Sequence, residues 1–232
     1  MRYLDAKGKD VLPRKDRIWS THAVAARTIE ALEAAERNVP RHLRLVLEAS
    51  APLKTATFAM HCYWVGEVQL GGLEGVIETR AAWRGHLEVV ELTYDPARIE
   101  YSTLLKSAQE LDCASTVFAH DDEQLATARK LVGDRAVLAE GDARPAKDSD
   151  RHHELRKSAL HYVPLTPMQR TKVNAALGSN GKPEAWLSPR QKETLGAIEE
   201  LLDNDAKALD EVTPAESLSQ LGAYIDALGR LL

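Results

Sequence analysis

Short β-rich runs alternate with helical patterns between residues 55 and 138, and this alternation constrains the fold more than any other feature of the chain. The β-rich runs cover residues 55–60, 75–80, 87–94 and 116–120. The helical patterns cover residues 64–70, 101–111 and 123–132. The resulting order is strand, helix, strand, strand, helix, strand, helix. This order predicts an α/β fold, an α+β sandwich built from a small mixed sheet with flanking helices.

The segments on either side of this region have different patterns. Before it, residues 20–38 form an Ala-rich helical pattern that Ser20 or Thr21 can cap, and alternating leucines predict a strand over residues 42–49. After it, a polar loop is expected over residues 141–151, and only helices follow. These helices are expected over residues 152–161, 167–177, 188–202 and 213–231. We therefore predict an N-terminal helical segment (1–42), a sheet domain (43–138), and a loop with a helical C-terminal extension (139–232).

Composition excludes several classes of protein. The 232 residues carry a formal charge of −5 and are 44% hydrophobic, so the chain can build a core and has no basic excess that would favour nucleic-acid binding. No apolar run approaches the ~20 residues that span a bilayer. The start of the sequence is polar and lacks the apolar stretch of a secretory signal, which predicts a cytoplasmic protein without a membrane partner. The sequence leaves the oligomeric state open.

Cys62 is the strongest candidate for a reactive group. It lies where a β-rich run ends and a helical pattern begins, and two aromatic residues, Tyr63 and Trp64, follow it. Thiolates are strong nucleophiles, and a helix N-terminus stabilises the anion. Aromatic rings beside a thiol can hold a small apolar group of a substrate, and an acid such as Glu88 can donate a proton to a leaving oxygen. Together these residues predict reduction of an oxidised sulfur by a thiol.

Other cysteine and histidine residues have simpler interpretations. A lone cysteine is most often a small buried hydrophobic residue, and we expect this of Cys113, with a role as resolving thiol as the alternative. His61 and His86 could tune Cys62 or bind a metal with it, but their spacing fits no zinc pattern, so we predict no metal site. The histidines of the C-terminal part are expected on a solvated helix face, together with the charged residues of 144–156. These histidines are His152, His153 and His161.

Residues 57–130 resemble the peptide methionine sulfoxide reductase A family in motifs that follow one another in the same order. The family has Gly-Cys-Phe-Trp-Gly at the end of a strand, and His61-Cys62-Tyr63-Trp64-Val65 stands in its place here. The later family motifs are Leu-Pro-Gly-Val, Gly-His-Ala-Glu, Tyr-Asp-Pro and His-Asp-Glu-Glu-Gln. Their counterparts are residues 73–76, 85–88, 94–96 and 120–124. Residues 150–153 more faintly resemble the family's Glu-Asp-Tyr-His-Gln.

The resemblance implies thiol-dependent reduction of methionine sulfoxide, like that of a peptide-methionine (S)-S-oxide reductase. Cys62 would attack the sulfoxide sulfur, Tyr63 with Trp64 would hold the methyl group, and Glu88 would protonate the departing oxygen. The redox-active thiol would become a sulfenic acid, which an external thiol of the thioredoxin or dithiothreitol type reduces. The resemblance therefore implies no bound cofactor. The implied partners are methionine sulfoxide, in a protein or as a small molecule, and a thioredoxin-like reductant.

The loops around the predicted site are shorter than in the family pattern. Between Thr79 and Gly85 the family has a longer loop, whose tyrosine binds the sulfoxide oxygen, and a second family loop has no counterpart after Asp112. We therefore expect weak turnover on methionine sulfoxide. Trp83 as a pocket wall and Arg84 as a hydrogen-bond donor are expected to substitute in part, with a simple surface position of both as the alternative. His86, beside the predicted acid, completes the predicted substrate-binding residues.

The alternative is a non-catalytic binding module that retains the reductase fold and recruits a partner through the helical extension. One structural observation separates the two interpretations. An accessible Cys62 that faces Glu88 favours the enzyme, whereas a Cys62 sealed in the core favours the binding module.

Overall fold

A computed structural model describes residues 1–232, which form two compact units, Met1–Pro52 and Leu53–Leu232. The first unit contains helices α1 (Thr21–Ala34) and α2 (Arg41–Ala49). The side chain of Ser20 caps α1 by accepting a hydrogen bond from the backbone N–H of Ala23.

The strand expected over residues 42–49 is wrong, because this segment is helix α2. Leu45 is buried, and the residues three positions before and after it, His42 and Glu48, are half-buried, which is helical spacing. A run of five residues with alternating leucines does not distinguish the two periods. A strand also needs a neighbour to pair with, and the first unit offers only helices and an isolated bridge.

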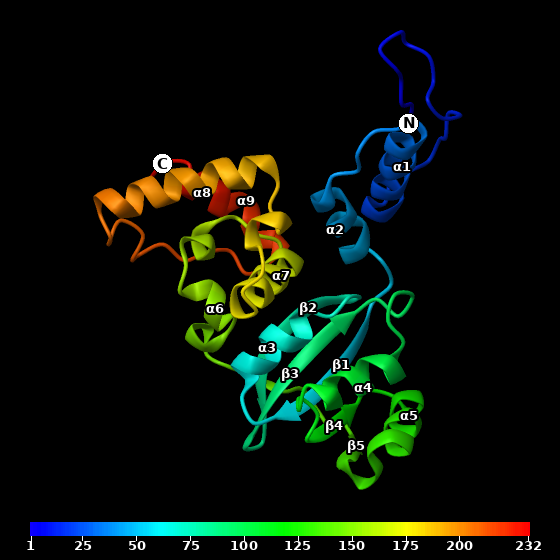
Figure 1. The fold of residues 1–232 in the computed structure, drawn as a ribbon, viewed down its shortest axis with the longest axis vertical. Helices are drawn as coiled ribbons and strands as arrows, with labels where there is room; N and C mark the ends of the chain where they lie inside the picture. Colours follow the sequence, from blue (N-terminus) through cyan, green and yellow to red (C-terminus); the bar gives the residue numbers. More distant parts are fainter. The chain divides into compact units, whose positions relative to one another are not determined.

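The second unit is built on a six-stranded sheet with the strand order β5-β4-β1-β3-β2-β6. Figure 1 labels strands β1 to β5 of this sheet. The strands are β1 (Lys54–Met60), β2 (Val76–Arg84), β3 (Leu87–Tyr94), β4 (Thr116–Ala119), β5 (Ala136–Leu138) and β6 (Arg144–Pro145). Every pair is antiparallel except β4 with β5. The mixed sheet confirms the predicted α/β class. The loop expected over residues 141–151 is interrupted by β6, whose two residues pair with Ala82 and Trp83.

One face of the sheet carries the main core. Helices α3 (Tyr63–Gly71), α4 (Tyr101–Glu110) and α5 (Asp122–Val132) pack against it, and their apolar residues form one cluster with Phe58, Val90 and Leu92 (Figure 1). Gly66 lets α3 approach closely, since a Cβ atom there would lie 1.9 Å from the sulfur of Met60. The opposite face has a smaller apolar cluster that contains Ala59, Ala82, Val89 and Ala143.

Helices follow one another from residue 151 onward, as predicted. They are α6 (His153–Arg156), α7 (Pro167–Gly178), α8 (Pro189–Asn204) and α9 (Leu218–Leu228), with short 3₁₀ turns between them. Capping boxes begin α7 at Thr166 and α8 at Ser188, each followed by proline in the first turn. These helices have their own apolar cluster, which includes Leu155, Val173 and Ile198.

Helix α7 joins this cluster to the sheet through polar side chains that are buried. Thr171 accepts a hydrogen bond from the backbone N–H of Thr79 in β2, at 3.0 Å. The ammonium group of Lys172 donates to the carbonyl oxygens of Gly71 and Leu73, both at 2.8 Å, where α3 ends. The C-terminal helices therefore also determine which groups lie along β2 and α3.

Candidate active site

Cys62 lies at the junction between β1 and α3. It is the N-cap residue of α3, with an extended backbone (φ −144°, ψ 116°), and its carbonyl oxygen accepts a hydrogen bond from Gly66. Its side chain makes no capping hydrogen bond and is half-buried. The thiol is therefore held at a helix N-terminus and is not sealed in the core.

Glu88 lies beside this junction because of the sheet register. On β3 it is paired with Met60 of β1 on one side and with Trp83 of β2 on the other. Its Oε2 atom accepts a hydrogen bond of 2.8 Å from the backbone N–H of Tyr63, the first residue of α3. The carboxyl group thus satisfies one of the free N–H groups at the start of α3, directly next to Cys62.

Three aromatic rings surround the start of α3. Tyr63 is buried and meets Trp64 and Trp83 edge-on, with ring centroids 6.3 Å and 5.7 Å apart. Trp64 is 37% exposed, and its ring stacks on the imidazole of His153 with centroids 3.9 Å apart and planes 2° from parallel. The structure therefore places Tyr63, Trp64 and Trp83 around the start of α3, where Cys62 is the N-cap. The group also includes His153, which was expected on a solvated face.

Asp150 also reaches this group, although sequence reasoning gave it no role. Burial raises the pKa of the Tyr63 hydroxyl to about 12, and a side-chain hydrogen bond and the negative charge of Asp150 act in the same direction. Glu88 and Cys62 contribute smaller electrostatic effects to the same pKa. Tyr63 therefore has acidic groups from three parts of the chain around it. The only sequence signal for Asp150 was the faint family motif at residues 150–153.

Glu67 holds the segment that carries Asp150 and His153. Its carboxyl group is buried and accepts hydrogen bonds from two backbone N–H groups, that of Ala81 on β2 at 3.1 Å and that of His152 at 2.7 Å. His152 has the left-handed conformation (φ 49°, ψ 53°), which is unusual for a residue other than glycine. Glu67 therefore fixes a strained turn against the edge of β2.

The solvated face expected for His152, His153 and His161 is wrong. The Nε2 atom of His152 and the Nδ1 atom of His161 are buried, and burial lowers the pKa of both imidazoles to about 3. The charged residues of 144–156 are also not uniformly solvated, since the Arg151 side chain is 21% exposed and pairs with Glu216. Arg151 and His152 lie between β2 and α7, and His153 stacks on Trp64 of α3, which is packing that no local sequence pattern shows.

Of the other predicted substrate-binding or tuning residues, Arg84 lies on the opposite face of the sheet, and His86 and His61 are exposed. Arg84 follows Trp83 on β2 and therefore points to the opposite face, where its guanidinium donates to the carbonyl oxygens of Glu140 and Gly141 and lies over Phe118. His86 is exposed in the turn between β2 and β3, and His61 is exposed before α3. The structure does not bring Arg84 to the Glu88 face of the sheet.

Cys113 is buried at the end of α4, and its thiol donates a hydrogen bond of 3.0 Å to Oε1 of Gln69. Burial raises the pKa of this thiol to about 11. Near neutral pH, only a small fraction of the Cys113 thiol would be in the reactive thiolate form. These features oppose a role as resolving thiol.

No group of three or more His, Cys, Asp or Glu side chains is arranged to hold a metal ion. None of the helices has the length and apolar character needed to cross a membrane.

Alkylation distinguishes the two cysteines. At pH 8, iodoacetamide is expected to label Cys62 at least ~10-fold faster than Cys113, because Cys62 is half-buried and Cys113 is buried with a raised pKa. Peptide mass spectrometry over a time course measures both rates in one sample. Labelling of both thiols at the same rate under native conditions would contradict the placement of Cys113. Labelling in denaturant, where the rates should converge, is the control.

Ionisation of Glu67 gives a prediction about stability. Burial raises the pKa of this carboxyl to about 8, although the two backbone hydrogen bonds act in the opposite direction. A carboxyl whose pKa is higher in the folded state contributes stability that is fully present below its unfolded pKa, near 4.5, and is lost as the pH rises through 8. Glu67→Gln is expected to lower the free energy of unfolding by about 1–3 kcal/mol at pH 4.5, because an amide NH₂ cannot accept the second backbone N–H.

Urea unfolding of both proteins between pH 4.5 and 8 measures this effect. The difference between wild type and Glu67→Gln is expected to shrink as the pH rises. A difference that grows with pH would show that the ionised carboxylate is the stabilising form.

Comparison with known proteins agrees with the motifs that surround Cys62. No family model matches the chain. A peptide methionine sulfoxide reductase MsrA of Geobacter sulfurreducens is 30% identical over 135 residues, which cover 49% of this chain and 77% of that protein. The chain belongs to the MsrA family. A peptide methionine sulfoxide reductase of Drosophila melanogaster is 30% identical over 123 residues, or 41% of this chain.

The chain is a divergent member of the MsrA family. An MsrA of Geobacter metallireducens is 34% identical over 77 residues, which cover 26% of this chain. The chain spans about half the length of this relative and of the Drosophila protein, 48% and 50% respectively. The MsrA likeness thus covers part of each protein.

Proposed function

We propose that this chain reduces methionine sulfoxide with Cys62 as the nucleophile and Glu88 as the proton donor. The observation that supports this most strongly is the hydrogen bond between the Glu88 carboxyl group and the N–H of Tyr63, because it holds an acid beside a half-buried thiol. The names of the MsrA relatives support the same type of substrate.

The proposed reaction has two stages. The Cys62 sulfur attacks the sulfoxide sulfur while a proton from Glu88 reaches the sulfoxide oxygen, whose bond to sulfur then breaks. The oxygen ends on Cys62, so the products are methionine and a cysteine sulfenic acid, and the proton of the original thiol restores Glu88. Two equivalents of an external thiol then reduce the sulfenic acid, releasing water and a disulfide of that thiol.

The aromatic rings supply the proposed binding site for the S-methyl group. Tyr63 and Trp83 present apolar surface next to the start of α3, and Trp64 extends this surface toward solvent. Sulfur and methyl groups make favourable contacts with aromatic rings. The stacked imidazole of His153 restricts the Trp64 ring to one orientation, which preorganises the pocket.

Incubation with dithiothreitol and separate epimers of free and peptide-bound methionine sulfoxide tests the proposal. Formation of methionine, with preference for one epimer, is the expected result. A lack of turnover on every member of the panel, with intact fold, would instead favour the non-catalytic binding module. Repeating the active reaction with thioredoxin and its reductase tests the proposed physiological reductant.

Trp83 and Arg84 provide a matched pair of variants, because they are adjacent in sequence but point to opposite faces of β2. Trp83→Ala is expected to lower kcat/KM by about 3–10-fold, since the edge-on contact with Tyr63 is lost. Arg84→Ala is expected to leave kcat/KM within about twofold, because its hydrogen bonds go to Glu140 and Gly141. Steady-state kinetics on one peptide sulfoxide compares the two. A larger loss in Arg84→Ala would contradict this assignment of faces.

A further inference from the structure

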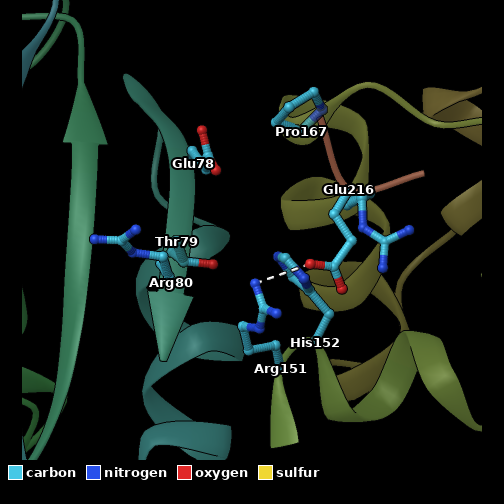
Figure 2. A pocket seen from close by; sticks show the side chains of 8 residues that line it. Glu78, Thr79, Arg80, Arg151, His152, Pro167 and Glu216 are labelled. Atoms are coloured by element: carbon cyan, nitrogen blue, oxygen red, sulfur yellow. Dashed lines mark ion pairs between the residues drawn. The ribbon is translucent and has the colours of Figure 1, made fainter. Parts of the chain in front are cut away.

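A small polar cavity lies between β2 and the segments that pack along it (Figure 2). Its volume is about 30 Å³, which is room for one chloride-sized ion or about two water molecules. It contains none of the residues proposed for sulfoxide reduction. The residues that line it are Glu78, Thr79, Arg80, Arg151, His152, Pro167, Arg170 and Glu216.

Buried polar atoms without a protein partner are concentrated around this cavity. The chain has seven such side-chain atoms, and three of them belong to residues of the lining: Oγ1 of Thr79, Nε of Arg151 and Nε2 of His152. Thr79 is only 1% exposed, and Figure 2 shows its hydroxyl pointing from β2 into the space between the sheet and the helices. The Nε atom of arginine can only donate a hydrogen bond, and a hydroxyl or an imidazole nitrogen is able to donate one. These three atoms therefore call for a hydrogen-bond acceptor in the cavity.

The charges around the cavity favour a negative occupant. Three arginines and two glutamates line it, so the formal charge of the lining is +1. Arg170 is 2% exposed, and its guanidinium has a long hydrogen bond of 3.4 Å to the carbonyl oxygen of Ala215. Glu216 is engaged by Arg151 at 2.9 Å. Buried positive charge of this kind is stabilised by a counter-ion.

Some of the lining charges are paired with carboxylates outside the cavity. Arg80 forms an ion pair with Glu91 of β3, and Arg151 pairs with Asp148 as well as with Glu216. Burial raises the pKa of the Glu78 carboxyl, and the positive charge of Arg80 acts in the opposite direction. Burial lowers the pKa of Arg170, the negative charge of Glu216 raises it, and the positive charges of Arg156 and Arg151 lower it further. The N-terminus of α7, where Pro167 is the first residue, adds the positive end of the helix dipole.

We propose that this cavity binds a small monovalent anion of chloride size. The anion accepts hydrogen bonds from Thr79 and Arg151 and neutralises the buried guanidinium of Arg170. It links β2 to α7 and to the turn at His152. The inference does not depend on the proposed reductase activity, because no residue of the cavity takes part in that reaction.

Thermal unfolding of the full chain at constant ionic strength tests the proposal. Replacing sodium gluconate by sodium chloride or bromide, at about tenfold above the dissociation constant, is expected to raise Tm by about 3–6 °C. Thr79→Val keeps the shape and the backbone hydrogen bond to Thr171, and its lost hydroxyl has no protein partner, so this variant should fold. Its halide-dependent shift is expected to be less than half of the wild-type shift. Thr55→Val, at an exposed position of β1, should retain the full shift.

Crystals grown or soaked with bromide give an independent measurement. An anomalous peak between Thr79 and Arg170 is the expected result. The proposal would be overturned by a Tm that does not respond to halide, or by an equal shift in Thr79→Val and wild type. The absence of a bromide peak would also overturn it and would leave water as the occupant.

Discussion

Cys62→Ser is expected to abolish sulfoxide reduction, with a loss of at least ~10³-fold in single-turnover rate, while the protein stays folded. Oxygen is a far weaker nucleophile than sulfur toward a sulfoxide, so the first step of the proposed reaction fails. Serine is nearly isosteric with cysteine and is favoured at the N-cap, where Cys62 itself makes no capping hydrogen bond. The variant should therefore be at least as stable as the wild type. Methionine formation in one turnover and thermal unfolding are the two measurements.

Cys113→Ser is the matched control for this experiment. A serine hydroxyl can replace the thiol as the donor to Gln69, so the buried site keeps its hydrogen bond. Activity with dithiothreitol is expected to stay within about twofold of wild type. Retained turnover in Cys62→Ser would place the chemistry elsewhere, and a comparable loss in both variants would reinstate Cys113 as a redox partner.

Local signals account for most of the fold that the sequence predicted. The β-rich runs that became β1 to β4 were visible, and the prolines after Thr166 and Ser188 marked the starts of α7 and α8. The two shortest strands were not predicted, because strands of two or three residues are defined by their neighbours. Ala136–Leu138 pairs with β4 and Arg144–Pro145 with β2, and neither has a distinctive composition.

Some residues of the candidate site could likewise be identified from the sequence, and others could not. Cys62 and Glu88 could be found because the family motifs contain them, and the hairpin register then places Trp83 opposite Glu88. The same register could have separated Arg84 from Trp83, since successive strand residues point to opposite faces. Glu67 and Asp150 could not be assigned from local pattern. Glu67 contacts His152, which is 85 positions away along the chain, and such a contact depends on how α7 packs the C-terminal segment against the sheet.

Glu88→Gln is expected to lower the rate of sulfoxide reduction by about 10²–10⁴-fold, equivalent to about 2.7–5.5 kcal/mol in activation free energy. The substitution is nearly isosteric, and the amide oxygen can still accept the hydrogen bond from the N–H of Tyr63. The start of α3 should thus keep its conformation, so the loss would report the missing acidic proton and not a displaced thiol.

Glu91→Gln is the matched control for the acid. Glu91 lies on the same strand three residues further on, points to the opposite face and pairs with Arg80. This variant should reduce sulfoxide at the wild-type rate, and its change in stability measures the cost of losing a paired carboxylate away from Cys62. Single-turnover methionine formation without reductant isolates the chemical step from recycling of the sulfenic acid. If Glu88→Gln and Glu91→Gln react equally fast, the proton must come from water or from another group near Cys62. Asp150 and the hydroxyl of Tyr63 should then be tested, because Asp150, Glu88 and Cys62 all lie close enough to Tyr63 to raise its pKa.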